Sequence, residues 1–173
     1  MTVLVREERP DDREASLAVE RAAFETDEET GVVVAVRDEE GSFALVAEED
    51  GEVVGHAQFS RAWVGQEAVL ALGPVAIAPA RQGRGIGSEL IRAGLEGARE
   101  RGEAAVIVLG DPVFYPRFGF EPALGLGLRN PFAGVLPDGF EIREEDFMVA
   151  VLDDRARGFA GEVRWHPAFG QGG

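Results

Sequence analysis

The segment with the clearest chemical potential is the run Gln-Gly-Arg-Gly-Ile-Gly-Ser at residues 82–88, in which glycines alternate. It follows an apolar run that stops at Pro79 and precedes a segment with helical spacing. Backbone N–H groups at the start of a helix lack intrahelical partners, and the helix dipole adds positive potential there. Glycines let that backbone approach an anion closely, and Gln82 and Arg84 add side-chain donors. The loop therefore predicts a site for the diphosphate of a nucleotide-like ligand.

Two other interpretations of this loop compete. In a plain helix entry, each glycine would cost about 1 kcal/mol relative to alanine, and the alternation would have no purpose. A dinucleotide-binding fold needs glycine where this chain has Ser88, and antiparallel strands precede the loop, which argues against that fold. All 17 basic residues are arginine. Without lysine, a Walker-type phosphate loop and a Schiff base are excluded.

Tyr115 is the only tyrosine in the chain, and it lies within an aromatic run that includes Phe114, Phe118 and Phe120. A phenol has an ordinary pKa of about 10, so it carries a proton that it can donate at neutral pH. The structural interpretation is that the ring packs among these phenylalanines and leaves its hydroxyl at the surface. The residues alone leave both interpretations open.

Composition excludes several other kinds of site. The chain has 173 residues and no cysteine, which rules out disulfides, thiolate metal sites and a cysteine nucleophile. His56 and His166 are too far apart in the sequence to suggest a metal site, and we expect no metal. The net charge of −15 would repel nucleic acid. It is explained first by solubility and only second by attraction of an amine substrate. The chain shows no long apolar run and no signal peptide, so we expect a cytoplasmic protein with no membrane partner.

Hydrophobic periodicity predicts one α/β domain over residues 1–173. We expect strands at residues 2–6, 42–48, 52–63, 67–78, 104–109, from 118, at 142–152 and near 163–165. We expect helices at residues 11–24, at a segment that ends near 37, at 85–101 and at 113–117. The segment 121–139, rich in glycine and proline, is predicted to be an ordered loop, and the end of the chain a flexible tail.

Turn residues predict how the strands connect. Asp50-Gly51 is a strong hairpin signal and Gly65-Gln66 turns the chain again, so three successive strands run antiparallel. The strand at 104–109 follows a helix and therefore runs parallel to the strand at 67–78.

Apolar residues repeat at helical spacing in two segments. In the first helix they are Ala15, Ala18, Val19, Ala22 and Ala23, and in the third they are Gly87, Leu90, Ile91, Gly94, Leu95 and Ala98. At the start of the first helix, Asp11 and Glu14 have capping-box spacing.

Two landmarks resemble the GNAT-type N-acetyltransferase superfamily. The glycine loop matches its Gln/Arg-x-x-Gly-x-Gly/Ala signature, and residues 75–79, Val-Ala-Ile-Ala-Pro, resemble its fourth strand. Residues 114–120, Phe-Tyr-Pro-Arg-Phe-Gly-Phe, resemble its aromatic-Tyr-x-basic-x-Gly-Phe landmark. The Leu-Gly-Pro, Gly-Asp-Pro and Trp-His-Pro-Ala-Phe segments at 72–74, 110–112 and 165–169 are similar to the YhbS-like branch. The resemblance covers about residues 1–170.

The resemblance implies acetyl-CoA as the co-substrate and a mixed, mostly antiparallel sheet that is splayed between its fourth and fifth strands, with helices on both faces. Backbone groups of Val75 and Ile77 would bind the acetyl and pantetheine groups, and Tyr115 would be the general acid for the departing thiolate. By position, the cofactor-binding residues are Val75, Ala76, Ile77, Gln82, Gly83, Arg84, Gly85, Ile86, Gly87 and Ser88.

The general base and the acceptor stay open. Many family members have a glutamate on the fourth strand where this chain has Ala71. A water relay could replace it, as could a side chain from elsewhere, namely Glu25, Glu67, Asp111 or His56. The structural interpretation, which we favour for each, is a surface acid for the three carboxylates and an ordinary strand residue for His56. The missing glutamate keeps a non-catalytic acyl-CoA-binding or protein-interaction module as an alternative. The resemblance implies an acceptor with a primary amine, either a small molecule or a peptide. We expect variable loops at 24–41 and 121–140 to select it, and a homodimer is possible.

Overall fold

The computed structural model describes residues 2–24, 26–132, 134–135 and 141–170. Their contacts form two compact units. The first contains Met1–Ser60 and Leu72–Gly97, and the second contains Arg61–Ala71 and Ala98–Gly173. The strands β3 (Glu52–Val64) and β4 (Glu67–Ile77) contribute residues to both units. The expectation of a single domain stays a prediction. No helix in the described part of the chain has the length and apolarity needed to cross a bilayer.

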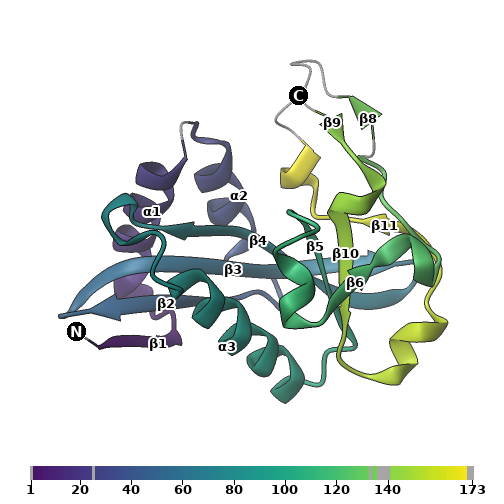
Figure 1. Ribbon diagram of the computed structural model, residues 1–173, viewed down its shortest axis with the longest axis horizontal. Coiled ribbons are helices and arrows are strands. Elements are labelled where there is room, and N and C mark those ends of the chain that lie inside the picture. Colours follow the sequence, from purple (N-terminus) through teal and green to yellow (C-terminus); the bar gives the residue numbers. More distant parts are fainter. Residues whose placement is uncertain (1, 25, 133, 136–140, 171–173) are drawn as a thin grey trace. The chain divides into compact units, whose positions relative to one another are not determined.

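The first unit combines strands with three α-helices (Figure 1). Its strands, besides parts of β3 and β4, are β1 (Val3–Glu7) and β2 (Phe43–Glu49), which pair as antiparallel neighbours in the order β1-β2-β3. The helices are α1 (Arg13–Ala23), α2 (Glu28–Val36) and α3 (Ile86–Glu100), the last of which ends in the second unit. The 3-10 turn η1 (Pro10–Asp12) precedes α1, and a second 3-10 turn, η2 (Pro79–Arg81), precedes the glycine loop.

The hairpin between β2 and β3 forms where the sequence predicts it. Asp50 and Gly51 have φ values of 54° and 80°. Two successive left-handed residues are typical of the tight turn whose twist matches a pair of antiparallel strands. The Asp-Gly pair therefore fixes the pairing of the strand ends that flank it, up to the irregularity between Ala47 and Glu48.

Helices cover both faces of β3, as expected. A Cβ built on Gly55 would lie 3.0 Å from Cδ1 of Leu90 in α3. The next residue, His56, has its Nδ1 2.7 Å from Oε1 of Glu20 in α1. Because successive strand residues point to opposite faces, α1 and α3 lie on opposite sides of the sheet. Glycine is also needed at position 94 of α3, where a Cβ would overlap the ring of Phe59.

The predicted apolar stripe is confirmed for α3, whose residues from Leu90 to Ala98 on that stripe are buried. For α1 the predicted buried face is only partly correct. Val19 is buried, but its buried neighbours are the polar Ser16 and Glu20 rather than the alanines. The reason is the ion pair between Glu20 and His56, which turns a polar position toward the sheet.

The predicted capping box at the start of α1 is wrong. The Asp12 carboxylate, rather than that of Asp11, organises this turn, because it accepts hydrogen bonds from the Arg9 backbone N–H at 2.7 Å and from Arg6 at 2.7 and 2.9 Å. The Arg6 hydrogen bond lowers the pKa of Asp12 to about 2. Asp12 therefore closes this turn locally through the Arg9 backbone N–H, and an ion pair with Arg6 of β1 holds the same carboxylate.

The second unit is built on β5 (Ala105–Leu109), β10 (Phe147–Val151) and β6 (Phe120–Pro122), which are antiparallel neighbours in that order. The pairing of β4 with β5 is parallel, with Leu70 opposite Val106 and Ala71 opposite Ile107. The expectation of a mixed, mostly antiparallel sheet is confirmed, including this parallel pair. The splay that the resemblance implies beyond these residues stays a prediction.

Shorter elements complete the second unit. The strands are β7 (Leu128–Arg129), β8 (Gly134–Val135), β9 (Glu141–Ile142) and β11 (Gly161–Arg164). The 3-10 turns are η3 (Tyr115–Phe118), η4 (Ala123–Leu126), η5 (Glu144–Asp146), η6 (Asp154–Gly158) and η7 (Pro167–Gly170). β11 pairs with β3 in an antiparallel and with β7 in a parallel arrangement. The turn at η3 agrees with the predicted short helix.

The strand predicted at 142–152 is confirmed over β10 (147–151) but is interrupted at residues 143–146. The chain forms β9, then η5, then β10, because Asp146 closes a turn by accepting a hydrogen bond from the Arg143 backbone N–H at 3.0 Å. The predicted loop at 121–139 contains η4, β7 and β8, and its residues 133 and 136–139 lie outside the described part. Residues 171–173 of the expected flexible tail also lie outside it.

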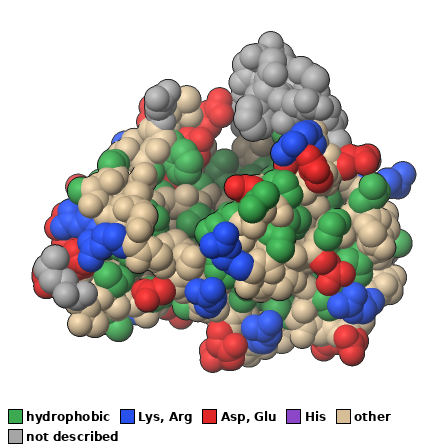
Figure 2. Space-filling view, viewed as in Figure 1, with side chains coloured by type: hydrophobic (Ala, Val, Ile, Leu, Met, Phe, Trp, Pro, Cys, Tyr) green, Lys and Arg blue, Asp and Glu red, His purple; other side chains and the backbone are tan. Residues whose placement is uncertain are grey.

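On the face drawn in Figure 2, acidic and basic side chains are interspersed.

Candidate functional site

The glycine loop connects η2 to α3 in the first unit. Gly83 and Gly85 have φ values of 78° and 81°, a conformation that other residues rarely adopt. A Cβ at either position would meet no atom within 4 Å, and the four residues 82–85 are exposed. Glycine is therefore needed here for backbone conformation, and the backbone remains open to a ligand. At Gly87, which lies in the first turn of α3, the nearest atom to an added Cβ would be Cγ1 of Ile77, at a distance of 3.9 Å.

The two polar side chains of the loop have partners inside the first unit. Gln82 Nε2 donates a hydrogen bond to the Ile77 carbonyl at 3.1 Å. Arg84 Nη2 lies 2.7 Å from Glu49 Oε2, and the Nε of Arg81 lies 3.4 Å from Glu49 Oε1. The hydrogen bond from Arg84 lowers the pKa of Glu49, so this carboxyl group is ionised. Glu49 could not be predicted from the sequence, because nothing in its neighbourhood along the chain marks it as a partner of the loop.

The remaining residues predicted to bind the co-substrate lie on β4 and in the first turn of α3. Ala76 and Ile86 are buried, whereas Val75, Ile77 and Ser88 are half-buried. All of the predicted binding residues from 75 to 88 belong to the first unit. Their roles toward acetyl-CoA stay predictions.

Tyr115 lies in the second unit, in an aromatic cluster. Its ring centroid is 5.3 Å from that of Phe114, 6.3 Å from that of Phe118 and 5.4 Å from that of Phe120, all edge-on. A Cβ on Gly110 would overlap this ring, so Gly110 provides the space that the phenol occupies. Burial, followed by the charge of Asp111, raises the pKa of Tyr115 above its ordinary value. The phenol is therefore protonated at neutral pH, as a proton donor must be.

The position of the missing base is occupied by a core residue. Ala71 is fully buried, and its backbone pairs with Ile107 of β5. Of the alternatives, Asp111 is exposed and its carboxylate accepts a hydrogen bond from the Val113 backbone N–H at 2.8 Å. Glu67 is also exposed, and Glu25 lies outside the described residues.

His56 is not the ordinary strand residue that we expected. It is fully buried between two carboxylates, with its Nδ1 2.7 Å from Glu20 and its Nε2 2.8 Å from Glu8. These carboxylates raise the pKa of His56 to about 9 against the opposing effect of burial. A histidine that stays protonated at neutral pH cannot accept the proton of an amine. Across the described ranges, no group of three or more His, Cys, Asp or Glu residues could hold a metal ion.

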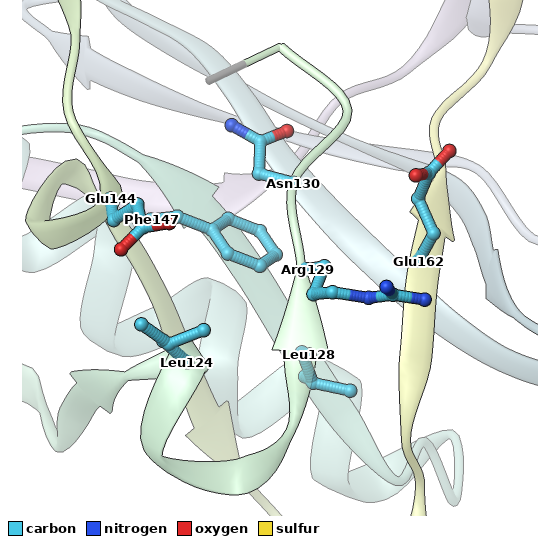
Figure 3. Close-up of a pocket in the computed structure, with 7 residues that line it drawn as sticks. All are labelled: Leu124, Leu128, Arg129, Asn130, Glu144, Phe147 and Glu162. Carbon is cyan, nitrogen blue, oxygen red and sulfur yellow. The ribbon is translucent and has the colours of Figure 1, made fainter. Parts of the chain in front are cut away.

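The second unit also contains a small cavity of about 200 Å³ (Figure 3). Four of its lining residues belong to the loop 121–140, which we expected to select the acceptor. The lining residues are Leu124, Leu128, Arg129, Asn130, Glu144, Phe147 and Glu162. Figure 3 shows the Arg129 side chain extending toward β11, which carries Glu162. The cavity thus combines an apolar wall with charges of both signs.

Comparison with known proteins agrees with this arrangement of elements. The family model of the acetyltransferase (GNAT) family matches residues 4–120. The chain is 36% identical to the uncharacterized N-acetyltransferase YhbS of Escherichia coli K12, over 96% of this chain and 98% of that protein. The crystal structure of the Escherichia coli YhbS protein in complex with CoA has a TM-score of 0.87, and the match covers 99% of this chain and 93% of that one.

A second solved structure extends the comparison. A GNAT family acetyltransferase from Brucella melitensis, in complex with acetyl-CoA, is 32% identical, with a TM-score of 0.75 and coverage of 97% of this chain and 98% of that one. The glycine loop, the strand before it and the aromatic landmark thus occur in a chain that resembles these proteins over almost its full length. This chain belongs to the GNAT family of acetyltransferases.

Proposed function

We propose that this protein transfers an acetyl group from acetyl-CoA to a primary amine, and that residues 82–88 bind the diphosphate. The observation that carries the proposal is the exposed loop with left-handed Gly83 and Gly85 between β4 and α3. Support also comes from two similar proteins that were solved with CoA and with acetyl-CoA.

The residues present fit such a co-substrate. The N–H groups in the first turn of α3, which have no partner within a helix, and the helix dipole favour a bound anion. No atom lies within 4 Å of the Cβ positions at Gly83 and Gly85, so a diphosphate can approach the backbone. Backbone groups of Val75 and Ile77 would bind the acetyl and pantetheine groups. When bound, acetyl-CoA supplies an activated thioester carbonyl.

The reaction that we propose is a direct acyl transfer. The amine nitrogen forms a bond to the carbonyl carbon, while the N–H of Val75 polarises the carbonyl oxygen. The carbon–sulfur bond breaks, and the hydroxyl of Tyr115 donates its proton to the departing thiolate. The amine releases its own proton to water, because Ala71 stands where many family members have a glutamate. Holding both reactants side by side contributes much of the rate enhancement.

A second candidate is an acyl-CoA-binding module without turnover. The buried Ala71 favours it, since this position offers no carboxylate as a base. The two candidates share the diphosphate site and differ only in catalysis. Binding of CoA therefore supports both, and release of free thiol separates them.

The experiment that tests the proposed function is a screen of amine acceptors that follows free thiol release from acetyl-CoA. The panel should contain polyamines, aminoglycosides, amino acids and peptides with free N-termini, each with a reaction that lacks enzyme. Thiol release that depends on one amine class, together with acetylated product in the mass spectrum, is expected. Binding of CoA without thiol release for any amine would favour the binding module instead.

A further inference from the structure

Glu49 is a buried carboxylate that pairs with two arginines, Arg81 just before the glycine loop and Arg84 within it. It is the last residue of β2, and its side chain is 1% exposed. One oxygen lies 2.7 Å from Nη2 of Arg84, and the other lies 3.4 Å from Nε of Arg81 and 3.4 Å from Nη1 of Arg84. Because a buried charge is costly unless it is paired, this carboxylate holds both guanidinium groups.

One of the two arginines lies just before the glycine loop and the other lies within it. Arg81 ends η2, whereas Arg84 lies between the left-handed Gly83 and Gly85. Residues 82–85 are exposed, and neither glycine has a neighbour near its Cβ position. Core packing therefore does not hold this segment. Its conformation depends on contacts such as those of Glu49, along with the hydrogen bond from Gln82 to the Ile77 carbonyl.

We propose that Glu49 is a positioning residue for the co-substrate, whose carboxylate fixes the glycine loop in its diphosphate-binding conformation through Arg81 and Arg84. This inference rests on the proposed function of the loop. Fixing a loop before binding lowers the entropic cost that binding would otherwise carry. Glu49 touches no reacting atom in this account and acts only through the two arginines.

The direction in which Glu49→Gln changes the affinity for CoA separates a positioning role of Glu49 from a purely electrostatic one. A carboxylate near a diphosphate repels it, so a purely electrostatic account predicts that Glu49→Gln strengthens the binding of CoA. Loss of loop positioning predicts the opposite, a dissociation constant for CoA that rises about 10-fold. Glu49→Asp, which keeps the charge, should recover part of the affinity.

Glu52 offers a matched control. Its carboxylate lies 3.9 Å from Nη2 of the same Arg81, but its side chain is 71% exposed. Glu52→Gln therefore removes the same charge from the same region without removing a buried partner. We expect its affinity for CoA to be unchanged or slightly higher.

The test combines calorimetric titration of CoA with steady-state kinetics on two donors. With acetyl-CoA, Glu49→Gln should raise KM about 10-fold and leave kcat unchanged. With S-acetyl-pantetheine, which has no diphosphate, the variant and the wild-type protein should show equal activity. A general loss of structure would lower activity with both donors, and thermal unfolding of each variant checks the fold directly.

The results have distinct meanings. Weaker CoA binding by Glu49→Gln, with normal use of S-acetyl-pantetheine and a normal Glu52→Gln protein, supports the inference. Equal or tighter binding by Glu49→Gln, or a parallel loss with both donors, overturns it. If the wild-type protein itself does not bind CoA, the proposed function fails, and the inference fails with it.

Discussion

Gly110 lies directly against the ring of Tyr115, in the space where any other residue would place its Cβ. Both residues belong to the second unit, and the backbone N–H of Gly110 is fixed at 2.9 Å from the Asp146 carbonyl. The glycine therefore cannot move aside easily, and a side chain there must displace the phenol. The position of the only tyrosine is thus determined by a residue that carries no functional group.

Gly110→Ala should displace the phenol and lower kcat about 10-fold, with little change in the dissociation constant for CoA. The measurement is steady-state kinetics with acetyl-CoA, together with calorimetric titration of CoA. Gly158→Ala is the control, because a Cβ there meets nothing within 4 Å. Normal kinetics for Gly110→Ala would show that the ring position does not matter to the reaction.

Tyr115→Phe should lower kcat about 100-fold, because a general acid typically contributes this much or more. The binding of CoA should be unchanged, since the ring and its aromatic contacts remain. Because burial raises the pKa of Tyr115 above 10, the wild-type enzyme should lose this proton donor only at a pH above 10. A pH profile of kcat for both proteins is the measurement. A variant as active as the wild type at every pH would remove Tyr115 from the mechanism.

Gly85→Ala should weaken CoA binding about 10-fold and cost about 1–2 kcal/mol in stability, since alanine is strained at a φ of 81°. Gly31→Ala in α2 is the control in the same unit, because its surroundings are open and it has no left-handed φ. That variant should bind CoA normally and be as stable as the wild type or slightly more so. Calorimetry and urea unfolding check both. An unchanged affinity for Gly85→Ala would argue against close backbone approach by the ligand.

His56 predicts a dependence of stability on pH. Its folded pKa of about 9 is above its ordinary value of 6.5. The stabilisation from its protonated form is therefore fully present below pH 6.5 and disappears as the pH rises through 9. The shift corresponds to about 3 kcal/mol. Urea unfolding between pH 6 and pH 10 measures it.

His56→Gln should flatten this part of the stability curve. Glu20→Gln should flatten it partly, because one of the two carboxylates that hold the imidazolium is lost. If wild-type stability stayed constant from pH 6.5 to 9, the buried imidazolium would be absent from the folded protein.

Local patterns predicted much of the fold. The Asp50-Gly51 turn, the apolar stripe of α3 and the helix between β4 and β5 each depend on residues that are close in sequence. The long-range polar contacts could not be predicted in this way. His56 is 36 residues from Glu20, and Arg84 is 35 residues from Glu49. No spacing rule connects such pairs, so a buried ion pair was taken for an ordinary strand residue.

The same division applies to the candidate site. The alternating glycines predicted a loop with unusual backbone conformations, because left-handed φ values favour glycine whatever the tertiary context. The carboxylate that holds Arg81 and Arg84 comes from a different strand and appears only in three dimensions. The role of Gly110 was missed for a related reason, since only the folded chain shows which ring lies over its Cα.

The central claim is that the backbone around Arg84 binds a diphosphate. Calorimetric titration of the wild-type protein with CoA and with pantetheine, which lacks the diphosphate and the nucleotide, tests it most directly. The account predicts that CoA binds at least 100-fold more tightly than pantetheine, about 3 kcal/mol of additional binding free energy. Equal affinities for the two ligands, or no heat with CoA at millimolar concentration, would contradict it.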